Sequence, residues 1–344
     1  MSAETVPGEV KQAVLLVGGL GTRLRPLTHT RPKALVPLLN RPLLSYELEL
    51  LARHGVRDVI LAVSYQADQL RAELGEGERW GLSLRYVEEA EPLGTAGGIK
   101  NVEALIEGPF LAFNGDLVME VDLRELGQAH LESEAVLTLC LRRVDDISAF
   151  GLIRRDEDGW VTAFLEKVEV DETGQNTVNS GVYVMSPEIL EHIPPGEECS
   201  NEHQLFPGLL EAGQRVYGHV PSAWGYWNDV GRLDGYLEAN RSLLNGALSW
   251  VGPGMAEDVK VAEGAEVVEP CLLGEGATIG SGATVGPWVT LGEGAVIGEG
   301  ARVSDSILWP RATVGRGARV KGSVVGEAAS VGDDAELGGG AIVQ

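Results

Sequence analysis

The sequence has few cysteines, few basic residues and no long apolar run. Its three cysteines (Cys140, Cys199 and Cys271) lie far apart and are odd in number, so neither a disulfide framework nor a cysteine-ligated zinc site is expected. The 27 basic residues face 51 acidic ones, and a formal net charge of −24 argues against nucleic acid or an anionic membrane as a partner. No run approaches about 18 uninterrupted apolar residues, and no secretory signal is visible. These absences predict a reduced, cytoplasmic protein.

Glycine, by contrast, is abundant, and its 46 residues crowd toward the C-terminus. From about residue 259, aliphatic residues recur every six positions, with two five-residue steps. A period of six fits neither a helix nor a single strand, but it fits a triangular β-solenoid in which each side points one aliphatic residue inward. Fifteen inward positions make about five coils, and so many in-phase residues argue against a disordered glycine-rich tail. The inward series is Val261, Val267, Leu273, Ile279, Val285, Leu291, Ile297, Val303, Leu308, Val314, Val320, Val325, Val331, Leu337 and Val343.

The first 245 residues alternate between strand-like and helix-like segments. Strands are expected at 12–17, 58–63, 82–87 and 110–113, and helices at 42–54, 67–74 and 95–105. This order predicts an α/β domain with a parallel sheet and helices on both faces. A hairpin at 150–154 and 161–166 predicts an antiparallel annex on that sheet, and 232–244 reads as a helix leading into the solenoid.

The predicted organisation is therefore an N-terminal extension (1–10), an α/β catalytic domain (11–245), a linker (246–258) and a solenoid (259–344).

The strongest local signal is the glycine-rich run GGLGTRLRPLT, which starts at Gly18 directly after the first strand. Glycines at the carboxyl end of a strand let the backbone approach a ligand and offer its N–H groups to phosphate. The run is not a dinucleotide fingerprint, because Leu24 stands where the third glycine belongs, and it is not a Walker A loop. Arg23 and Lys33 could converge on one triphosphate, although an isolated Arg or Lys is more often a simple surface cation.

These residues carry a family resemblance. The run GGLGTRLRPLT followed by RPKALVPLLNRPLL resembles the signature of the sugar-1-phosphate nucleotidyltransferases, also called NDP-sugar pyrophosphorylases. Further blocks match in the family's order: EPLGTAG at 91–97, NGD at 114–116, EK at 166–167, NSGVY at 179–183 and WNDVG at 227–231. The resemblance implies a Rossmann-like domain with a mostly parallel sheet, followed by a left-handed parallel β-helix of hexapeptide repeats. The first run and EPLGTAG look most like mannose-1-phosphate guanylyltransferases.

The resemblance implies a reaction in which an NTP and a hexose-1-phosphate give an NDP-sugar and pyrophosphate. GTP with mannose-1-phosphate is the expected pair, and a glucose-1-phosphate thymidylyl- or uridylyltransferase is the alternative. The implied catalytic residues are Arg23, Lys33, Asp116 and Asp229, with Asp116 and Asp229 sharing a Mg²⁺ ion that touches the α-phosphate. Nucleotide-binding residues would be Gly18, Gly19, Gly21, Thr22, Arg23, Lys33, Pro92, Gly94 and Thr95.

On the sugar side, the resemblance implies that Glu166 accepts hydroxyl hydrogen bonds and that Lys167 pairs with the sugar phosphate. The other residues expected in this pocket are Gly151, Asn179, Gly181 and Trp227. Two positions depart from the family's usual pattern, since Val168 stands where proline is usual and Ser180 where alanine is common. The motifs therefore predict the identity of the sugar less strongly than that of the nucleotide.

Two other functions, an acyltransferase and a non-catalytic regulatory protein, are alternatives to a nucleotidyltransferase. A solenoid acyltransferase would need a histidine base between coils, but all six histidines precede the solenoid. A non-catalytic regulatory paralogue predicts erosion of the phosphate-binding or metal-binding residues, and all four catalytic candidates are present.

Two expectations concern the solenoid itself. Trp288 and Trp309 are expected at the surface or at an interface. The last coil carries no capping segment in this sequence, which predicts a homo-oligomer formed through the solenoid.

Overall fold

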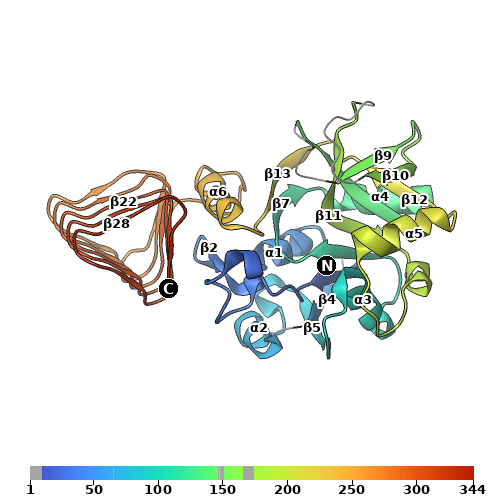
Figure 1. The fold of residues 1–344 in the computed structure, drawn as a ribbon, viewed down its shortest axis with the longest axis horizontal. Coiled ribbons are helices and arrows are strands. Elements are labelled where there is room, and N and C mark those ends of the chain that lie inside the picture. The colour runs from blue at the N-terminus through green and yellow to red at the C-terminus, as the bar shows by residue number, and fades with distance from the viewer. Residues whose placement is uncertain (1–9, 65, 146, 148–150, 166–173) are drawn as a thin grey trace, which may run out of the picture. The chain divides into compact units, whose positions relative to one another are not determined.

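The computed structural model describes residues 10–64, 66–145, 147, 151–165 and 174–344 (Figure 1). Its internal contacts divide the chain into two units. The sheet unit comprises Met1–Gly19 and Tyr46–Trp224, and the solenoid unit comprises Leu20–Ser45 and Gly225–Gln344. The division differs from the predicted domains, because part of the segment 11–245 belongs with the solenoid. The boundary falls inside the glycine-rich run, between Gly19 and Leu20.

The sheet unit is built on the predicted parallel sheet. Strands β1 (Gln12–Leu16), β4 (Asp58–Val63), β5 (Ser83–Glu88) and β6 (Phe110–Asn114) run parallel in the order β6-β1-β4-β5. The near-continuous apolar runs of β1, β4 and β6 are typical of strands buried on both faces, whereas β5, at the end of the sheet, is more polar and more exposed. The carboxyl ends of all four strands therefore lie along one edge of the sheet.

The antiparallel annex is also present. Strand β11 (Thr177–Met185) pairs antiparallel with β6 and with β8 (Leu137–Arg143). Strands β9 (Leu152–Arg155) and β10 (Val161–Leu165) form the predicted hairpin, and β12 (Val216–His219) runs parallel to β8. The sheet thus extends beyond β6 in the order β10-β9-β11-β6.

Of the helices in the described residues, four lie close to where the sequence places them, and two further ones, the fourth and fifth in the chain, were not predicted. In chain order they are α1 (Ser45–Arg53), α2 (Ala67–Leu74), α3 (Gly94–Asn101), α4 (Leu123–Ser133), α5 (Phe206–Glu211) and α6 (Leu233–Leu244). The first begins three residues later than predicted, because residues 37–42 form a small hairpin of β2 (Pro37–Leu38) and β3 (Arg41–Pro42). The segment predicted as the helix 95–105 divides into α3 and a 3₁₀ turn at Glu103–Leu105. No helix in the described part of the chain is long and apolar enough to cross a membrane.

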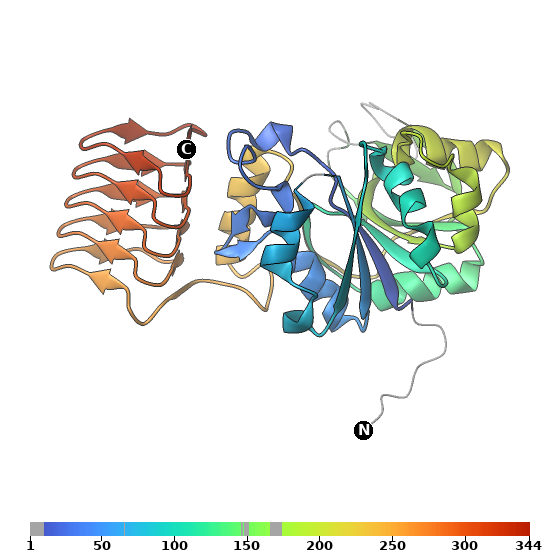
Figure 2. The same cartoon turned by 90° about the horizontal axis from the view of Figure 1, so that it is seen from below.

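The solenoid is a left-handed parallel β-helix with three flat faces. Figure 1 shows the coils end-on as triangles, and Figure 2 shows them stacked. The first face holds β14 (Gly254–Met255), β17 (Cys271–Leu273), β20 (Val289–Leu291), β23 (Ile307–Leu308), β26 (Val324–Val325) and β29 (Ile342–Val343). The second holds β15 (Lys260–Val261), β18 (Thr278–Ile279), β21 (Val296–Ile297), β24 (Thr313–Val314) and β27 (Ser330–Val331). The third holds β16 (Glu266–Val267), β19 (Thr284–Val285), β22 (Arg302–Ser304), β25 (Arg319–Lys321) and β28 (Glu336–Leu337).

The predicted inward series forms the solenoid core. From Leu273 to Val331 its members are buried, whereas Val261 in the first coil is 43% exposed. Glycine follows several inward residues because the next coil is too close for a side chain. A Cβ on Gly298, for example, would lie 2.7 Å from the backbone nitrogen of Arg316. The solenoid also starts earlier than expected, since β14 lies inside the predicted linker 246–258.

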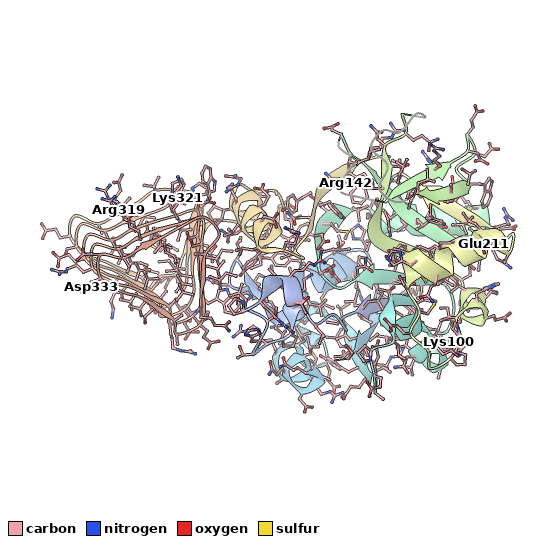
Figure 3. All side chains as sticks on the ribbon, in the orientation of Figure 1. Lys100, Arg142, Glu211, Arg319, Lys321 and Asp333 are labelled. Carbon is pink, nitrogen blue, oxygen red and sulfur yellow. The ribbon has the colours of Figure 1, made fainter. Side chains whose placement is uncertain are left out.

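Only the first face of the solenoid has buried outward residues among these described strands. Thr290, Ile307 and Val324 are at most 1% exposed, whereas Val296 on the second face is 40% exposed. Arg319, Lys321 and Asp333, away from the first face, point outward from the prism (Figure 3).

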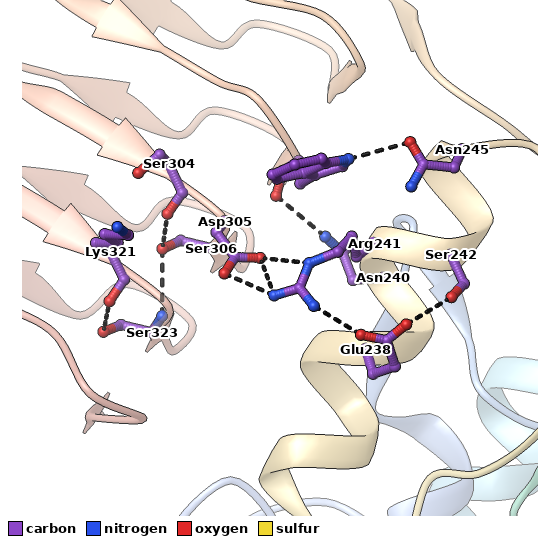
Figure 4. A network of polar contacts seen from close by, with 11 residues as sticks. Glu238, Asn240, Arg241, Ser242, Asn245, Ser304, Asp305, Ser306, Lys321 and Ser323 are labelled. Atoms are coloured by element: carbon purple, nitrogen blue, oxygen red, sulfur yellow. Dashed lines mark hydrogen bonds and ion pairs between the residues drawn. The ribbon is translucent and has the colours of Figure 1, made fainter.

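Helix α6 covers part of the first face. Arg241 binds Asp305 through two nitrogens, at 2.8 to 3.2 Å (Figure 4). Asn240 accepts a hydrogen bond from the buried Thr290 hydroxyl at 2.7 Å. Trp309, expected at the surface or an interface, is 1% exposed and lies within this intramolecular contact.

Candidate active site

The glycine-rich run begins at the carboxyl edge of the parallel sheet. The Ser64 hydroxyl, just past β4, donates a hydrogen bond to the Gly18 carbonyl, and a Cβ on Gly18 would lie 2.9 Å from that hydroxyl oxygen. Gly19 is exposed, and a Cβ built on it would meet nothing within 4 Å. The backbone at Gly19 is therefore open to close approach by a ligand.

The second half of the run lies in the solenoid unit and is packed too tightly for side chains. Gly21 has a φ of +59°, and a Cβ on it would lie 2.9 Å from Thr28 Cγ2 and 3.1 Å from Lys33 Cβ. The Thr28 hydroxyl donates to the Gly21 carbonyl at 2.8 Å. Both the backbone conformation and this close contact require glycine. The fold thus brings the second half of the glycine-rich run and Lys33 together.

Lys33 begins a 3₁₀ turn, Lys33–Leu35, and is 9% exposed. A lysine this buried is held in place by its surroundings far more than a surface cation would be. Thr22 and Arg23, in the 3₁₀ turn Thr22–Leu24, are exposed.

Arg23 and Asp229 come together around Gly231. A Cβ on Gly231 would lie 2.7 Å from Asp229 Oδ1 and 3.0 Å from Arg23 Nη2. Asp229 ends strand β13 (Trp224–Asp229), and Trp227 in the same strand is half-buried. Two of the four catalytic candidates therefore flank one buried glycine within the solenoid unit.

Asp116 follows strand β6 at the carboxyl edge of the sheet. The Gly115 amide donates to the Leu16 carbonyl at 3.0 Å, and a Cβ on Gly115 would lie 2.6 Å from that oxygen. Because Gly115 lies so close to the end of β1, the half-buried Asp116 is held in a tight turn before β7 (Leu117–Val121). The turn is further fixed by the buried Glu47 carboxylate, which accepts the Leu117 amide at 2.9 Å.

The EPLGTAG block leads into α3, which begins at its Gly94. Gly94 has a φ of +72°, and a Cβ on it would lie 2.7 Å from the Cys199 carbonyl oxygen. The Thr95 hydroxyl accepts the Asn201 amide at 2.7 Å. Gly94 and Thr95 are thus fixed by the segment around Cys199, while Pro92 is exposed.

Glu89 lies beside Gly18 at this candidate site, and the sequence interpretation did not single it out. It follows β5 at the same sheet edge and accepts the Leu93 amide at 3.2 Å through Oε2. A Cβ on Gly98 would lie 2.7 Å from Glu89 Oε1, and a Cβ on Gly18 would lie 3.6 Å from Oε2. Burial of the half-exposed carboxyl raises the pKa of Glu89. The available signal was its position, since it comes directly after a parallel strand, as Gly18 and Asp116 do.

Asn179 and Gly181 lie together on β11. The Asn179 side chain accepts the Gly181 amide at 3.0 Å and donates to the Tyr183 hydroxyl at 2.7 Å. Gly181 has a φ of +82°, and a Cβ on it would lie 3.1 Å from Asn114 Nδ2. Burial raises the Tyr183 pKa well above its ordinary value, so this hydroxyl stays neutral and donates to Glu202 at 3.1 Å.

Ser180, the departure from the family's alanine, has a structural role. It is 1% exposed, and its hydroxyl donates to the Cys140 carbonyl at 2.8 Å. Cys140 is fully buried, and burial raises the pKa of its thiol to about 12, as is typical of a cysteine that packs in the core.

Gly151, Glu166 and Lys167 are the other residues that were predicted to line the sugar pocket. Gly151 is exposed and directly precedes β9. Glu166 and Lys167 lie outside the described residues, as does Val168.

Comparison with known proteins places the chain in a family. Residues 12–246 match the family described as Nucleotidyl transferase, and residues 267–344 match the GMPPB C-terminal domain. The chain belongs to the nucleotidyl transferase family. Its similarity to the sugar-1-phosphate nucleotidyltransferases, predicted from the ordered motifs, is thereby confirmed.

Several proteins resemble the chain over about two thirds to three quarters of its length. It is 42% identical to the mannose-1-phosphate guanylyltransferase of Mycobacterium tuberculosis over 68% of this chain and 65% of that protein. It is 36% identical to the catalytic subunit beta of the enzyme of that name from Drosophila pseudoobscura pseudoobscura, over 76% of this chain and 71% of that protein. Among solved structures, the chain matches the crystal structure of HddC from Yersinia pseudotuberculosis complexed with GMP-PN, with a TM-score of 0.57 and 32% sequence identity. The match covers 67% of this chain and 98% of that one.

Nucleotidyltransferases of this family generally use a divalent metal ion. Within the described residues, no group of three or more His, Cys, Asp or Glu side chains could hold a metal ion. The carboxylate side chains of Asp116 and Asp229 nevertheless suit Mg²⁺. Proteins usually bind this ion with one or two carboxylates, and substrate phosphates supply further ligands. Asp116 belongs to the sheet unit and Asp229 to the solenoid unit, so their sharing of one ion remains a prediction.

Proposed function

We propose that this protein joins GTP and mannose-1-phosphate to give GDP-mannose and pyrophosphate. The observation that carries the proposal is the tight packing of Gly21 against Lys33 in a chain of this family. Such a turn offers backbone amides and a fixed cation to a polyphosphate. The identities of 42% and 36% to mannose-1-phosphate guanylyltransferases support the choice of nucleotide and sugar.

Two phosphate-bearing anions must meet in this reaction, so charge neutralisation and in-line positioning carry most of the catalysis. In our proposal, the amides of residues 18–22 hold the nucleotide. Arg23 and Lys33 neutralise the β- and γ-phosphates, which leave as pyrophosphate. Asp116 and Asp229 hold Mg²⁺, which supplies further positive charge at the α-phosphate.

The sugar phosphate binds, in our proposal, to the other family blocks. Asn179 and Gly181, fixed to each other on β11, line the sugar pocket together with Gly151, Glu166, Lys167 and Trp227. Glu166 accepts sugar hydroxyls and Lys167 pairs with the phosphate.

Glu89 supports guanine as the base. Guanine presents two neighbouring N–H donors on its Watson–Crick edge, and a carboxylate can accept both. Glu89 is half-buried near Gly18 and at the start of α3, where Pro92, Gly94 and Thr95 would frame the base. Uracil and thymine each offer one N–H between two carbonyls, so the same carboxylate would also meet acceptor oxygens.

The test of the proposed function is pyrophosphate release from each NTP with each common hexose-1-phosphate. We expect turnover only with both substrates and a divalent metal, and the highest kcat/KM for GTP with mannose-1-phosphate. A higher kcat/KM for UTP or TTP with glucose-1-phosphate would refute the specificity. Absence of turnover with every pair would favour a regulatory, non-catalytic protein.

The base assignment has its own test in Glu89→Gln. The amide replaces one acceptor oxygen with a donor, and one good bidentate pair is worth about 1–3 kcal/mol. We therefore expect kcat/KM for GTP to fall about 5- to 150-fold, with a smaller change for UTP. Glu88→Gln, at the neighbouring exposed position, is the matched control. Equal losses for GTP and UTP would contradict the assignment.

We also propose that the protein is a cytoplasmic homo-oligomer. Met255 and Val261, inward positions of the first coil, are 51% and 43% exposed, which favours a second copy against this end of the solenoid. Three buried free cysteines fit a reducing compartment. We expect Val261→Lys to lower the oligomer mass measured by light scattering, and Val296→Lys on the second face to leave it unchanged. A wild-type monomer at micromolar concentration would refute the assembly.

A further inference from the structure

The first face of the solenoid contacts the segment that carries Lys33, and both belong to the solenoid unit. Tyr236 of α6, which is fully buried, connects the two. Its hydroxyl accepts a hydrogen bond from Trp309 Nε1 at 3.0 Å and donates one to the Pro37 carbonyl of β2. One side chain therefore ties the solenoid to the strand that begins four residues after Lys33.

A second contact lies on the other side of Lys33 in sequence. The Arg31 guanidinium sits 4.7 Å from the centre of the buried Trp309 ring, and it forms an ion pair with Glu327 of the solenoid. A cation over a tryptophan face, shielded from water, is held more strongly than an exposed ion pair. Arg31 is thus oriented by two solenoid residues while only one residue separates it from Lys33.

The tip of the β2–β3 hairpin makes a third contact. The Asn40 side chain donates to the Leu291 carbonyl of β20 at 2.8 Å. Leu39 and Asn40 have φ values of 44° and 57°, although leucine in this left-handed region is unfavourable by roughly 1–2 kcal/mol. Such a backbone persists where its surroundings impose it, and Leu39 is 3% exposed.

Backbone hydrogen bonds carry these contacts to Lys33. The Val36 amide donates to the Lys33 carbonyl at 3.0 Å, and the Leu44 amide, beyond the hairpin, donates to the Ala34 carbonyl at 2.9 Å. Lys33 Cβ in turn lies against Gly21. The residues on both sides of Lys33 are therefore fixed to the solenoid.

We propose that the first face of the solenoid positions Lys33 for its phosphate contact, with Arg31, Tyr236 and Trp309 as positioning residues. The inference rests on the proposed function, in which Lys33 neutralises the phosphates of the NTP. The solenoid then has a role in nucleotide binding through a rigid contact, without touching the nucleotide. Loosening the contact should weaken the NTP interaction selectively, because Lys33 faces the phosphates and not the sugar.

The experiment compares Arg31→Ala, Arg31→Lys and Tyr236→Phe in the full-length protein. The control is Arg319→Ala, which removes an arginine that pairs with Glu336 on the third face. Because misplacing a catalytic group by about 1 Å can cost 100-fold, we expect Arg31→Ala and Tyr236→Phe to raise KM for GTP about tenfold. KM for mannose-1-phosphate should stay within about twofold, Arg31→Lys should recover part of the loss, and Arg319→Ala should match the wild type.

Amide hydrogen exchange of residues 32–44 gives a readout that does not depend on activity. We expect exchange there to be faster in Arg31→Ala and Tyr236→Phe than in the wild type and in Arg319→Ala. An unchanged KM for GTP, equal losses for both substrates, or unchanged exchange would each overturn the inference. If the wild type turns over no substrate pair, the proposed function fails, and the exchange of residues 32–44 alone then decides whether the solenoid holds this segment.

Discussion

Replacing Gly19 with alanine separates the folding role of the glycine-rich run from its ligand role. Gly19 is exposed, its φ lies outside the left-handed region, and an added Cβ meets no other atom within 4 Å. The methyl group therefore disturbs nothing in the folded protein, while it restricts the unfolded chain. We expect the free energy of unfolding to stay the same or to rise by up to about 1 kcal/mol.

The same methyl group should nevertheless lower activity. If the amides of this run hold the NTP phosphates, the methyl occupies space that a phosphate oxygen needs. Losing one hydrogen bond to a charged oxygen costs about 1.5–3 kcal/mol, and each 1.4 kcal/mol corresponds to about a factor of ten. We therefore expect Gly19→Ala to lower kcat/KM for GTP by about 10- to 150-fold.

Two assays and two companion variants test this reasoning. Thermal unfolding measures stability, and pyrophosphate release measures kcat/KM. Gly108→Ala is the matched control, because Gly108 also has open surroundings and an ordinary φ; it should affect stability as Gly19→Ala does and leave kcat/KM unchanged. Gly21→Ala should lose about 1–2 kcal/mol of stability, because its φ of +59° disfavours a side chain. Full activity of Gly19→Ala would refute the close approach of phosphate to this residue.

Three further predictions concern charge. Lys33→Ala and Asp229→Asn should each lower kcat/KM by roughly two to three orders of magnitude with an unchanged circular dichroism spectrum, and near-normal activity in either would contradict its role. Excess chelator should abolish turnover and added Mg²⁺ should restore it; turnover that persists in chelator would exclude the metal assignment. Burial lowers the pKa of His130 to about 4, so the unfolded chain binds a proton near pH 6.5 that the folded protein does not. The free energy of unfolding should therefore fall between pH 6.5 and pH 4, by at most about 3 kcal/mol, and thermal unfolding of His130→Gln should show a smaller dependence.

The fold was largely predictable because its elements are locally encoded. The apolar runs before Gly18 and Asp116 have the composition of parallel strands, and the hexapeptide period needs no long-range information. The misplaced boundaries have physical causes. The helix predicted from Pro42 starts at Ser45 because Pro42 pairs with Pro37 in the hairpin, and such pairing leaves no periodic signal.

The candidate site was predicted less completely than the fold. Motifs identified the residues that meet around Gly21 and around Gly231, because those blocks have a recognisable order. They did not identify Glu89, whose importance depends on its distance to Gly18 and to the Leu93 amide. A single carboxylate after a strand is often only a helix cap or a turn residue. Its proximity to other strand ends becomes visible only in the folded structure.

The contact between the solenoid and the Lys33 segment joins residues about 250 to 300 positions apart, such as Asn40 with Leu291. Part of its signal was nevertheless present in the sequence. In each coil, the residue before an inward position points outward, and every third such residue belongs to the same face. On the third face these residues are Glu266, Thr284, Arg302, Arg319 and Glu336, which suit solvent.

On the first face, the corresponding residues are Leu272, Thr290, Ile307, Val324 and Ile342. A solvated face has no reason to carry four aliphatic residues out of five, because each would expose apolar surface. Both five-residue steps of the repeat also arrive on this face, at Leu308 and Val325. When the outward residues are compared coil by coil on each face, the sequence therefore indicates that the first face is covered. Helix α6, which accepts a hydrogen bond from the Thr290 hydroxyl, and the hairpin, which donates one to the Leu291 carbonyl, are the structural basis for linking the solenoid to Lys33.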